Sequence, residues 1–291
     1  DDIKKIIIKS ITMQAKCVLN KFKPKIIAVT GNVGKTSTKD AIFLALKNYG
    51  DVRCSEKSFN GDTGVPLSIL GLPNGWNNPI LWFSNIMNGF TIMFFNKSYP
   101  KYLVLEIGAD HPNDILSISK WLKPDISVFT YFPKVPVHIE FFSDLEEVIK
   151  EKKSLAKYTK KDGILILNHN DNRVMELYNY EDRKTFTFGT TKDSDLFIKK
   201  TVFDFDKNSS HGSTVELSLQ GRDYLLSLLN IASPGHVISA NIALLVVHAL
   251  GFDIGNAIET LKDYRTPKGR FSIIDGINNT TIIDDTYNSS P

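Results

Sequence analysis

The sequence is poor in several features that would assign a protein quickly. It has only two cysteines, Cys17 and Cys54, which lie far apart and belong to no Cys-x-x-Cys or Cys/His cluster. This spacing excludes a disulfide framework and a zinc finger, and a reducing cytoplasm is the simplest compartment for such a chain. No run of 18 apolar residues occurs, so we expect no helix that spans a membrane.

The chain also lacks a strong charge of either sign. Its 35 Lys and Arg residues face 32 Asp and Glu residues, which gives a net charge of +3. A balance this mild argues against nucleic acid as the main partner. The length of 291 residues, 42% of them hydrophobic, is typical of a globular protein with one large domain or two small ones.

The pattern of apolar residues indicates an α/β fold. Residues 3–22 have helical spacing with lysines between the apolar positions, and Pro24 ends that helix or linker of residues 1–24. Residues 25–30 form a β-branched run, which predicts a buried parallel strand, and a helix is expected near 35–48. Further strands are expected at 102–107, 126–130 and 163–167. Helices between these strands predict a mostly parallel sheet with flanking helices.

The pattern changes from about residue 184. Four short strands divided by Asp, Asn, Ser and Gly are expected at 185–188, 196–203, 214–219 and 224–229. We interpret them as antiparallel hairpins that form a smaller sheet over residues 184–232. Two helices at 236–250 and 254–263 follow, and a last hairpin joins 271–275 to 281–284.

The turn after the first predicted strand has the composition of a phosphate-binding loop. Small residues let backbone N–H groups close around phosphate oxygens at the start of a helix. The lysine would reach the β- and γ-phosphates of ATP, and the threonine hydroxyl would bind Mg²⁺. The complete motif has glycine where this chain has Val29, so an ordinary glycine-rich turn with a solvated lysine is the alternative. The candidate nucleotide-binding residues are Gly31, Asn32, Val33, Gly34, Lys35, Thr36 and Ser37.

Further short motifs follow the phosphate loop in a characteristic order. They are Asn60 with Gly64-Val65-Pro66-Leu67, Leu105-Glu106-Ile107-Gly108-Ala109, His138-Ile139-Glu140 with Glu151-Lys152, Asn168-His169-Asn170-Asp171, Pro234-Gly235-His236 with Asn241, and Gly269-Arg270-Phe271 with Asp284-Asp285-Thr286-Tyr287-Asn288. Over about residues 25–291 this order resembles the Mur ligase family, most closely its branch that joins D-alanyl-D-alanine to a UDP-muramoyl tripeptide. The resemblance implies an ATP- and Mg²⁺-dependent amide-bond ligase of peptidoglycan precursor synthesis.

The resemblance implies a metal site as well. Thr36, Glu106 and His138 would be Mg²⁺ ligands, and Lys152 falls where the family has a carbamylated lysine. A neutral amine that captures CO₂ becomes an anionic oxygen ligand on a long stem. The alternatives are a surface carboxylate for Glu106 and a structural role for His138. For Lys152 the alternative is a solvated charge run on a helix.

The remaining ligand contacts are implied in the same way. Asn241 and Asp285 resemble contacts to adenine and ribose, Arg270 would lie near the phosphates, and Asn60 would contact substrate. A buried helix residue is the alternative for Asn241, and a turn residue is the alternative for Asp285. Lys35, Lys152 and His138 are the residues expected to act in catalysis.

The chain departs from the family in two places. The segment from Thr130 to His138 is longer than usual and contains two prolines, and residues 74–100 look like an insertion. Within that insertion, residues 80–95 are strongly apolar, and Asn85, Asn88 and Gly89 are expected to leave a polar side. Two interpretations stay open: an interfacial helix for a membrane or partner, and a helix packed on the same molecule.

The expected reaction is ATP-dependent ligation through an acyl phosphate by a cytoplasmic monomer. Another Mur-like or folylpolyglutamate-like ligase is the first alternative, and a P-loop NTPase without ligation is the second. A degenerate binding module is disfavoured by the intact Lys35, Thr36, Glu106 and His138. The family's N-terminal UDP-substrate domain and its C-terminal domain are expected to be absent from this chain.

Overall fold

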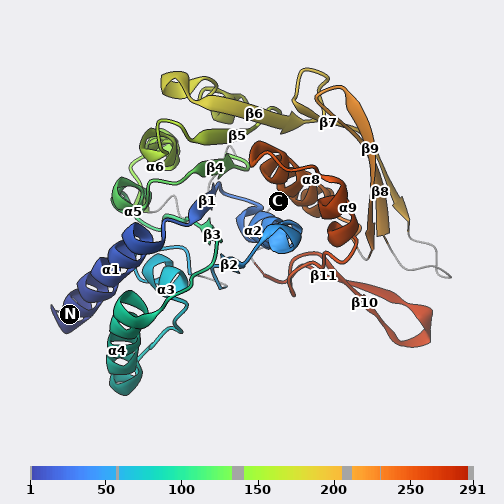
Figure 1. The fold of residues 1–291 in the computed structure, drawn as a ribbon. Helices are drawn as coiled ribbons and strands as arrows, with labels where there is room; N and C mark the ends of the chain where they lie inside the picture. The colour runs from blue at the N-terminus through green and yellow to red at the C-terminus, as the bar shows by residue number, and fades with distance from the viewer. Residues whose placement is uncertain (1, 57–58, 133–140, 205–211, 230, 288–291) are drawn as a thin grey trace.

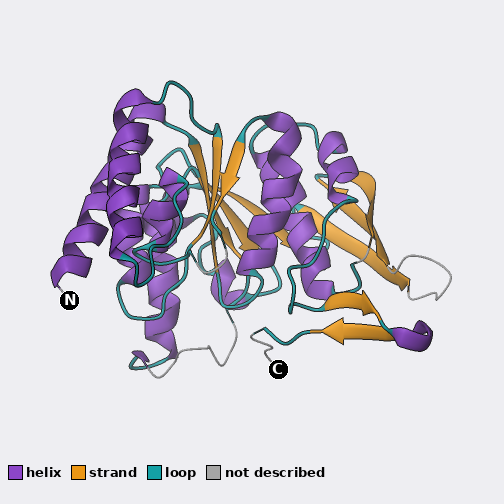
Figure 2. Ribbon diagram, turned by 90° about the horizontal axis from the view of Figure 1, so that it is seen from below, coloured by secondary structure: helices purple, strands orange, loops and turns teal. Residues whose placement is uncertain are grey.

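A computed structural model describes residues 2–56, 59–132, 141–204, 212–229 and 231–287. Its main feature is a nine-stranded sheet, which lies between two layers of helices (Figures 1 and 2). The strand order is β2 (Val52–Cys54), β3 (Tyr102–Glu106), β1 (Lys25–Thr30), β4 (Ile126–Phe129), β5 (Ile164–Asn168), β6 (Lys184–Gly189), β7 (Leu196–Asp204), β8 (Gly212–Leu219) and β9 (Arg222–Leu229). The predicted α/β fold with a mostly parallel sheet is therefore confirmed.

Alternation along β1 divides the core into two parts. Ile27 and Val29 point to one face of the sheet, where α2 (Lys35–Leu46), α8 (Pro234–Ala249) and α9 (Gly255–Leu261) pack. Ile26 and Ala28 point to the other face. That face is covered by α1 (Asp2–Phe22), α3 (Gly64–Leu70), α5 (Asp114–Leu122), α6 (Leu145–Tyr158) and the short α7 (Asn172–Met175).

One expectation about the strands after residue 184 was wrong. The strand β6 is not part of an antiparallel hairpin, because it pairs in parallel with β5 over five residue pairs. Within the main sheet, antiparallel pairing joins β7 to β8 and β8 to β9, and these strands extend that sheet instead of forming a separate one. Turn residues mark where a strand ends, but they do not show which neighbour the next strand will pair with.

The separate small sheet is the predicted last hairpin. It consists of β10 (Ser272–Asp275) and β11 (Thr281–Asp284), which pair antiparallel around a short 3₁₀ turn at Ile277–Asn279. Figure 2 shows this hairpin standing apart from the large sheet, below α8 and α9. The two chain segments that enter and leave the hairpin lie side by side at its base. There the Tyr287 N–H, after β11, donates to the Gly269 carbonyl, before β10, across 2.8 Å.

The insertion contains the predicted helix, α4 (Pro79–Phe95), and it packs beside α1. Its orientation reverses most of one prediction, because Asn85 and Gly89 are buried and only Asn88 of the three expected polar-side residues is exposed. The Asn85 side chain donates to the Pro73 carbonyl across 2.7 Å, and a Cβ on Gly89 would lie 2.0 Å from Gln14 Oε1. Small and amide residues thus permit close contact between the helices. The helix packs on the same molecule by this face, and its opposite, apolar face is exposed.

Candidate nucleotide and metal site

The phosphate loop connects the end of β1 to the start of α2, as predicted. Gly31 has a φ of 145°, and a Cβ there would lie 2.0 Å from Thr130 Oγ1, so the close contact requires glycine. Gly34 precedes the first helical residue with a φ of 82°, a left-handed conformation that glycine adopts without strain. Both glycines of the motif therefore shape the loop.

The neighbouring strand β4 holds the loop from behind. The Thr130 hydroxyl donates to the Val33 carbonyl across 2.6 Å, and the Asn32 N–H donates to the Tyr131 carbonyl across 2.8 Å. Asn168 in turn donates to the Thr130 carbonyl across 2.7 Å from the end of β5. The loop is consequently preorganised by residues from the carboxyl ends of three adjacent parallel strands.

Lys35 is the first residue of α2, and its ammonium lies over the loop. Its Nζ donates to the Asn32 carbonyl across 3.1 Å. The pKa of Lys35 is lowered, mainly because the surrounding protein desolvates the ammonium, while Glu106 acts in the opposite direction and Arg270 adds to the lowering. The exposed Asp110 also raises the pKa. The cations and carboxylates of the site are therefore close enough to influence one another.

A buried carboxylate joins three segments beside this lysine. The Thr36 hydroxyl donates to Glu106 Oε2 across 2.8 Å, and the Asn60 amide lies 3.4 Å from Glu106 Oε1. Glu106 ends β3 and is only 5% exposed. Within the described parts of the chain, no three His, Cys, Asp or Glu residues form a metal cluster. A candidate Mg²⁺ site here would instead use the Glu106 carboxylate and the Thr36 hydroxyl, which are the hard oxygen ligands that Mg²⁺ prefers.

Lys152 is buried on α6, which contradicts its interpretation as part of a solvated charge run. It is 4% exposed, whereas Lys150 is exposed and Lys153 forms an ion pair with Glu176. Burial, with a smaller contribution from the positive charge of Lys35, lowers the pKa of Lys152 to about 7. At neutral pH a large share of this amine is therefore uncharged, which is the form that reacts with CO₂.

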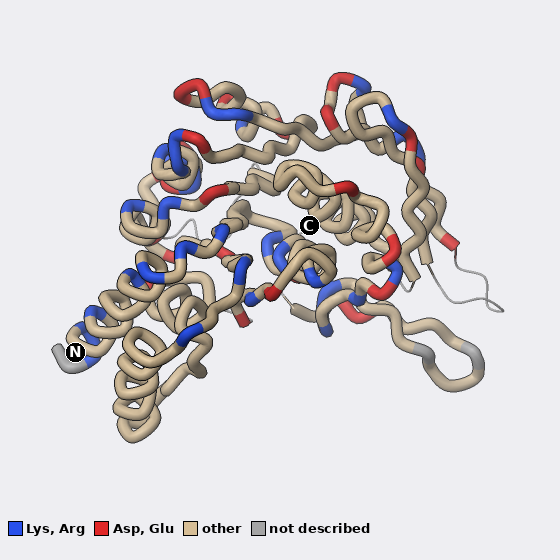
Figure 3. Tube along the Cα trace, in the orientation of Figure 1, with Lys and Arg blue, Asp and Glu red and all other residues tan. Residues whose placement is uncertain are grey.

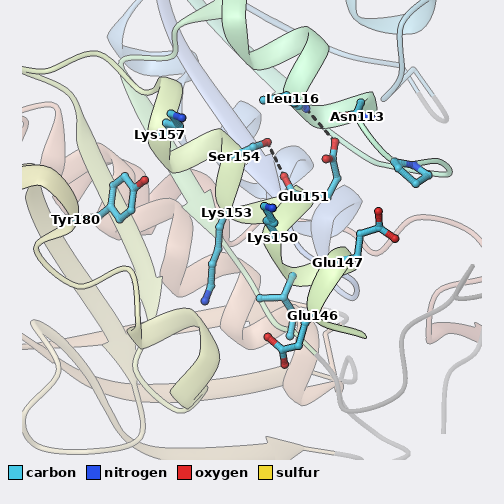
Figure 4. A pocket seen from close by; sticks show the side chains of 12 residues that line it. Asn113, Leu116, Glu146, Glu147, Lys150, Glu151, Lys153, Ser154, Lys157 and Tyr180 are labelled. Carbon is cyan, nitrogen blue, oxygen red and sulfur yellow. Dashed lines mark hydrogen bonds between the residues drawn. The ribbon is translucent and has the colours of Figure 1, made fainter. Parts of the chain in front are cut away.

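The outer side of the same helix is a different environment. A hollow between α5 and α6 is lined by both acidic and basic side chains, among them Glu146, Glu147 and Lys150 (Figure 4). In the wall of this hollow, Glu151 accepts a hydrogen bond from the Leu116 N–H across 2.9 Å. Because the two charge signs alternate there, the hollow indicates no ligand class, and Lys152 does not line it.

Helix α8 and the segment after α9 hold α2 on its other side. The Ser37 hydroxyl lies 3.1 Å from His236 Nε2, and the Tyr264 hydroxyl donates to the Ser37 carbonyl across 2.8 Å. Burial lowers the pKa of His236 to about 4, with a further contribution from the charge of Arg270, so the ring is neutral at physiological pH. His236 Nδ1 is buried with no hydrogen-bond partner in the described structure.

The base of the last hairpin brings two predicted ligand residues toward this site. The Phe271 N–H donates to Asp285 Oδ1 across 3.1 Å, and Arg270 lies over the Tyr287 ring at 4.7 Å from its centroid. Arg270 acts electrostatically on both Lys35 and His236, and Asp285 acts on His236. Residues far apart in the sequence are thus collected near the phosphate loop.

Among the described residues, one predicted ligand contact is not joined to this cluster. Asn241 is fully buried within α8, where its Nδ2 donates to the Val237 carbonyl across 2.8 Å and its Oδ1 has no partner among the described residues. This position fits the alternative of a buried helix residue, and the proposed adenine contact stays a prediction. His138 lies outside the described residues.

Sequence reasoning missed three residues of the site. Asp110 follows Glu106 by four positions and was not singled out, although a second acid after a metal-binding strand is a usable signal. His236 belonged to a quoted motif but was given no role. Tyr264 had no local signal, because only the folded chain brings it to Ser37.

The model of the Mur ligase middle domain matches residues 29–247. This match covers most of the chain, including the phosphate loop and most of helix α8. The chain belongs to the Mur ligase family.

Individual Mur ligases support this assignment. The chain is 28% identical over 276 residues to the UDP-N-acetylmuramoyl-tripeptide--D-alanyl-D-alanine ligase of Rickettsia prowazekii, covering 92% of this chain and 54% of that protein. It is 29% identical over 302 residues to the ligase of the same name from Buchnera aphidicola, covering 99% of this chain and 57% of that protein. The chain therefore spans little more than half the length of these relatives.

The solved structures agree on the fold of this Mur ligase. The MurF ligase of Thermotoga maritima in complex with ADP superimposes with a TM-score of 0.78 at 24% identity, over 97% of this chain and 58% of that one. At this identity the likeness supports the fold alone.

Proposed function

We propose that the chain is the ATP-binding part of a ligase that joins D-alanyl-D-alanine to a UDP-muramoyl tripeptide in peptidoglycan precursor synthesis. The observation that carries the proposal is the contact between Thr36 and Glu106 directly beside Lys35. It combines a phosphate loop with a buried carboxylate in a Mur ligase middle domain. The two named relatives with which the chain aligns over at least 92% of its length bear this activity in their names.

The reaction would proceed through an acyl phosphate. A substrate carboxylate oxygen attacks the γ-phosphorus of ATP, the bond to the β–γ bridging oxygen breaks, and ADP leaves. The amine of D-alanyl-D-alanine then attacks the carbonyl carbon, and inorganic phosphate leaves as the amide forms. Lys35 would neutralise charge on the transferring phosphoryl group, and the loop N–H groups would orient the phosphates.

Mg²⁺ fits the oxygen donors at the loop. Thr36 and Glu106 would hold one ion, which supplies charge neutralisation to the phosphates when it is bound. A carbamate on Lys152 would provide an anionic oxygen toward a second ion, and the lowered pKa of this amine supports the modification. His138 would be a further ligand, as the family resemblance implies.

The proposal is tested by phosphate release from ATP in the protein at its full natural length. We expect release that requires both the UDP-muramoyl tripeptide and D-alanyl-D-alanine, with one amide formed per phosphate. Release that needs neither substrate would support an NTPase without ligation. Release that requires a different acid or amine would support another Mur-like or folylpolyglutamate-like ligase.

Carbamylation has its own test. Lys152→Ala should abolish ligation, and short-chain carboxylic acids should restore part of it by filling the vacated ligand position. Labelled bicarbonate should give a carbamate carbon signal in the wild-type protein and none in this variant. A wild-type protein that ligates fully in CO₂-free buffer and shows no such signal would contradict the modification.

The proposed enzyme is a cytoplasmic monomer. No helix in the described part of the chain is both long and apolar enough to cross a bilayer.

A further inference from the structure

Helix α4 exposes an apolar stripe to solvent. Ile80, Phe83, Met87 and Phe94, which we call the α4 stripe, recur at helical spacing and are 79%, 66%, 51% and 66% exposed. The Phe90 ring fills the gap along the stripe and stacks on Phe94 with 6.3 Å between ring centroids. Contiguous exposed apolar surface of this kind marks an interaction site.

The helix is attached firmly, so the stripe keeps its orientation. Asn78 caps its first turn by accepting hydrogen bonds from the N–H groups of Ile80 and Leu81 at 3.0 and 3.2 Å. Lys21 of α1 holds its last turn by donating to the carbonyls of Met93 and Asn96 at 3.0 and 2.9 Å. The inward face carries the amide and glycine contacts described above. The stripe is therefore not available for burial against the domain.

The segments around the stripe carry mainly positive charge. Residues 63–105, which include α3 and α4, contain no Asp or Glu, and their charged residues are Lys97 and Lys101. Residues 3–39, which include all of α1 after its first residue Asp2, also contain no Asp or Glu. In Figure 3 the α4 segment has no blue or red position, which means that it carries no charged residue. The adjacent α1 has several blue positions, which are lysines.

Lysines lie at both ends of α4. At its beginning, Lys4 lines one hollow together with Trp76 and Pro79, and the Trp76 side chain is 76% exposed. At its end, Lys21 contacts the last turn, and the exposed Lys97 follows directly. An apolar helix face flanked by lysines and an exposed tryptophan has the character of an interfacial helix on an anionic lipid surface.

We propose that the α4 stripe and its flanking lysines form a peripheral docking surface for an anionic membrane. The helix has 17 residues and one face committed to α1, so it would lie in the headgroup region instead of crossing the bilayer. The charge complementarity selects a lipid surface over a second copy of this chain, whose own stripe carries the same positive surroundings. The proposal is independent of the ligase reaction.

Co-sedimentation with lipid vesicles tests the proposal. The protein at its full natural length should bind vesicles that contain phosphatidylglycerol and should bind pure phosphatidylcholine vesicles at least about fivefold more weakly, with binding reduced by salt. Phe83→Ser with Met87→Ser should reduce the affinity by about tenfold or more, since each side chain loses its burial in lipid. Lys4→Glu with Lys97→Glu should reduce binding to the anionic vesicles alone.

Matched variants elsewhere provide the controls. Leu225→Ser removes an apolar side chain that is 59% exposed on β9, and Lys192→Glu reverses an exposed charge in a distant turn. Both should bind vesicles as the wild type does, and all variants should keep the wild-type melting temperature. Absence of binding to anionic vesicles at low salt would overturn the proposal, as would equal binding to both lipids. Self-association that disappears with Phe83→Ser and Met87→Ser would also overturn it, because a second copy would then cover the stripe.

Discussion

Thr36 and Glu106 are 70 residues apart in sequence, and their side chains meet in a buried hydrogen bond of 2.8 Å. The bond joins the first turn of α2 to the end of β3. A carboxylate in this position has two possible roles, since it can hold the loop or hold a cation. The following variants separate these roles and test the neighbouring groups.

Replacing Lys35 tests the phosphate site itself. Lys35→Ala should reduce ligation and ATP hydrolysis by about a hundredfold or more, because the cation that neutralises the transferring phosphoryl group is removed. The melting temperature should stay near that of the wild type, since the ammonium makes a single hydrogen bond to the described residues, to the Asn32 carbonyl. Phosphate release and thermal denaturation measure the two effects. A folded variant that ligates at the wild-type rate would remove Lys35 from the mechanism.

Replacing Glu106 separates the metal role from the structural role. Glu106→Gln keeps an acceptor for the Thr36 hydroxyl but loses the negative charge. We therefore expect a small change in stability and a rise of about tenfold or more in the Mg²⁺ concentration that gives half-maximal phosphate release. Glu259→Gln, on the surface of α9, is the matched control. An unchanged Mg²⁺ requirement with a large loss of stability would show that Glu106 only holds the loop.

Burial of Lys152 predicts a pH-dependent cost to stability. Its pKa falls from 10.5 to about 7 in the folded state, so between these values the unfolded chain binds a proton that the folded chain does not. Stability therefore rises with pH through this window. In CO₂-free buffer, Lys152→Met should be more stable than the wild type near pH 7, by at most about 5 kcal/mol, and this gain should shrink toward pH 10.

The neighbouring lysine supplies the control for that measurement. Lys150 is exposed on the same helix, so Lys150→Met should leave the dependence of the unfolding free energy on pH unchanged. Chemical denaturation at several pH values gives the comparison. A Lys152→Met variant that is equally destabilised at every pH would mean that the buried amine makes a favourable contact, contrary to the lowered pKa.

His236 predicts the behaviour at acid pH. Its pKa falls from 6.5 to about 4 on folding, so stability is lost as the pH falls through this range, by up to about 3 kcal/mol. His236→Gln can keep a hydrogen bond to Ser37 and should flatten this part of the pH profile. The exposed His111→Gln serves as the control. A profile that stays as steep in His236→Gln as in the wild type would assign the acid sensitivity to other groups.

Local patterns in the sequence were sufficient for most of the elements. The β-branched run at 25–30, the glycines of the phosphate loop and the apolar spacing of the helices each depend on neighbours along the chain. The orientation of α4 was mispredicted because Asn85 and Gly89 look like a polar face. They are instead where α1 comes closest, and only the position of Gln14 explains this.

The contacts of the site were harder to predict for the same physical reason. Thr36 and Glu106 were each expected near Mg²⁺, but the hydrogen bond between them depends on β1 and β3 being adjacent in the sheet. The burial of Lys152 depends on which side of α6 faces the sheet. His236 and Tyr264 support Ser37 from more than 190 residues away, and no local pattern reports such a contact.

This long-range support of α2 affects when the protein becomes able to bind a nucleotide during synthesis. The loop residues are made early, but the groups that brace Ser37 are provided only by residues 236 and 264. A ribosome-bound chain that ends before residue 264 would carry the loop without the Tyr264 contact that completes its bracing. Contacts of such high sequence separation form late in folding. We therefore expect nascent chains to acquire tight ATP binding only after this segment has left the ribosome. Chaperones would then be able to bind the domain before ATP does.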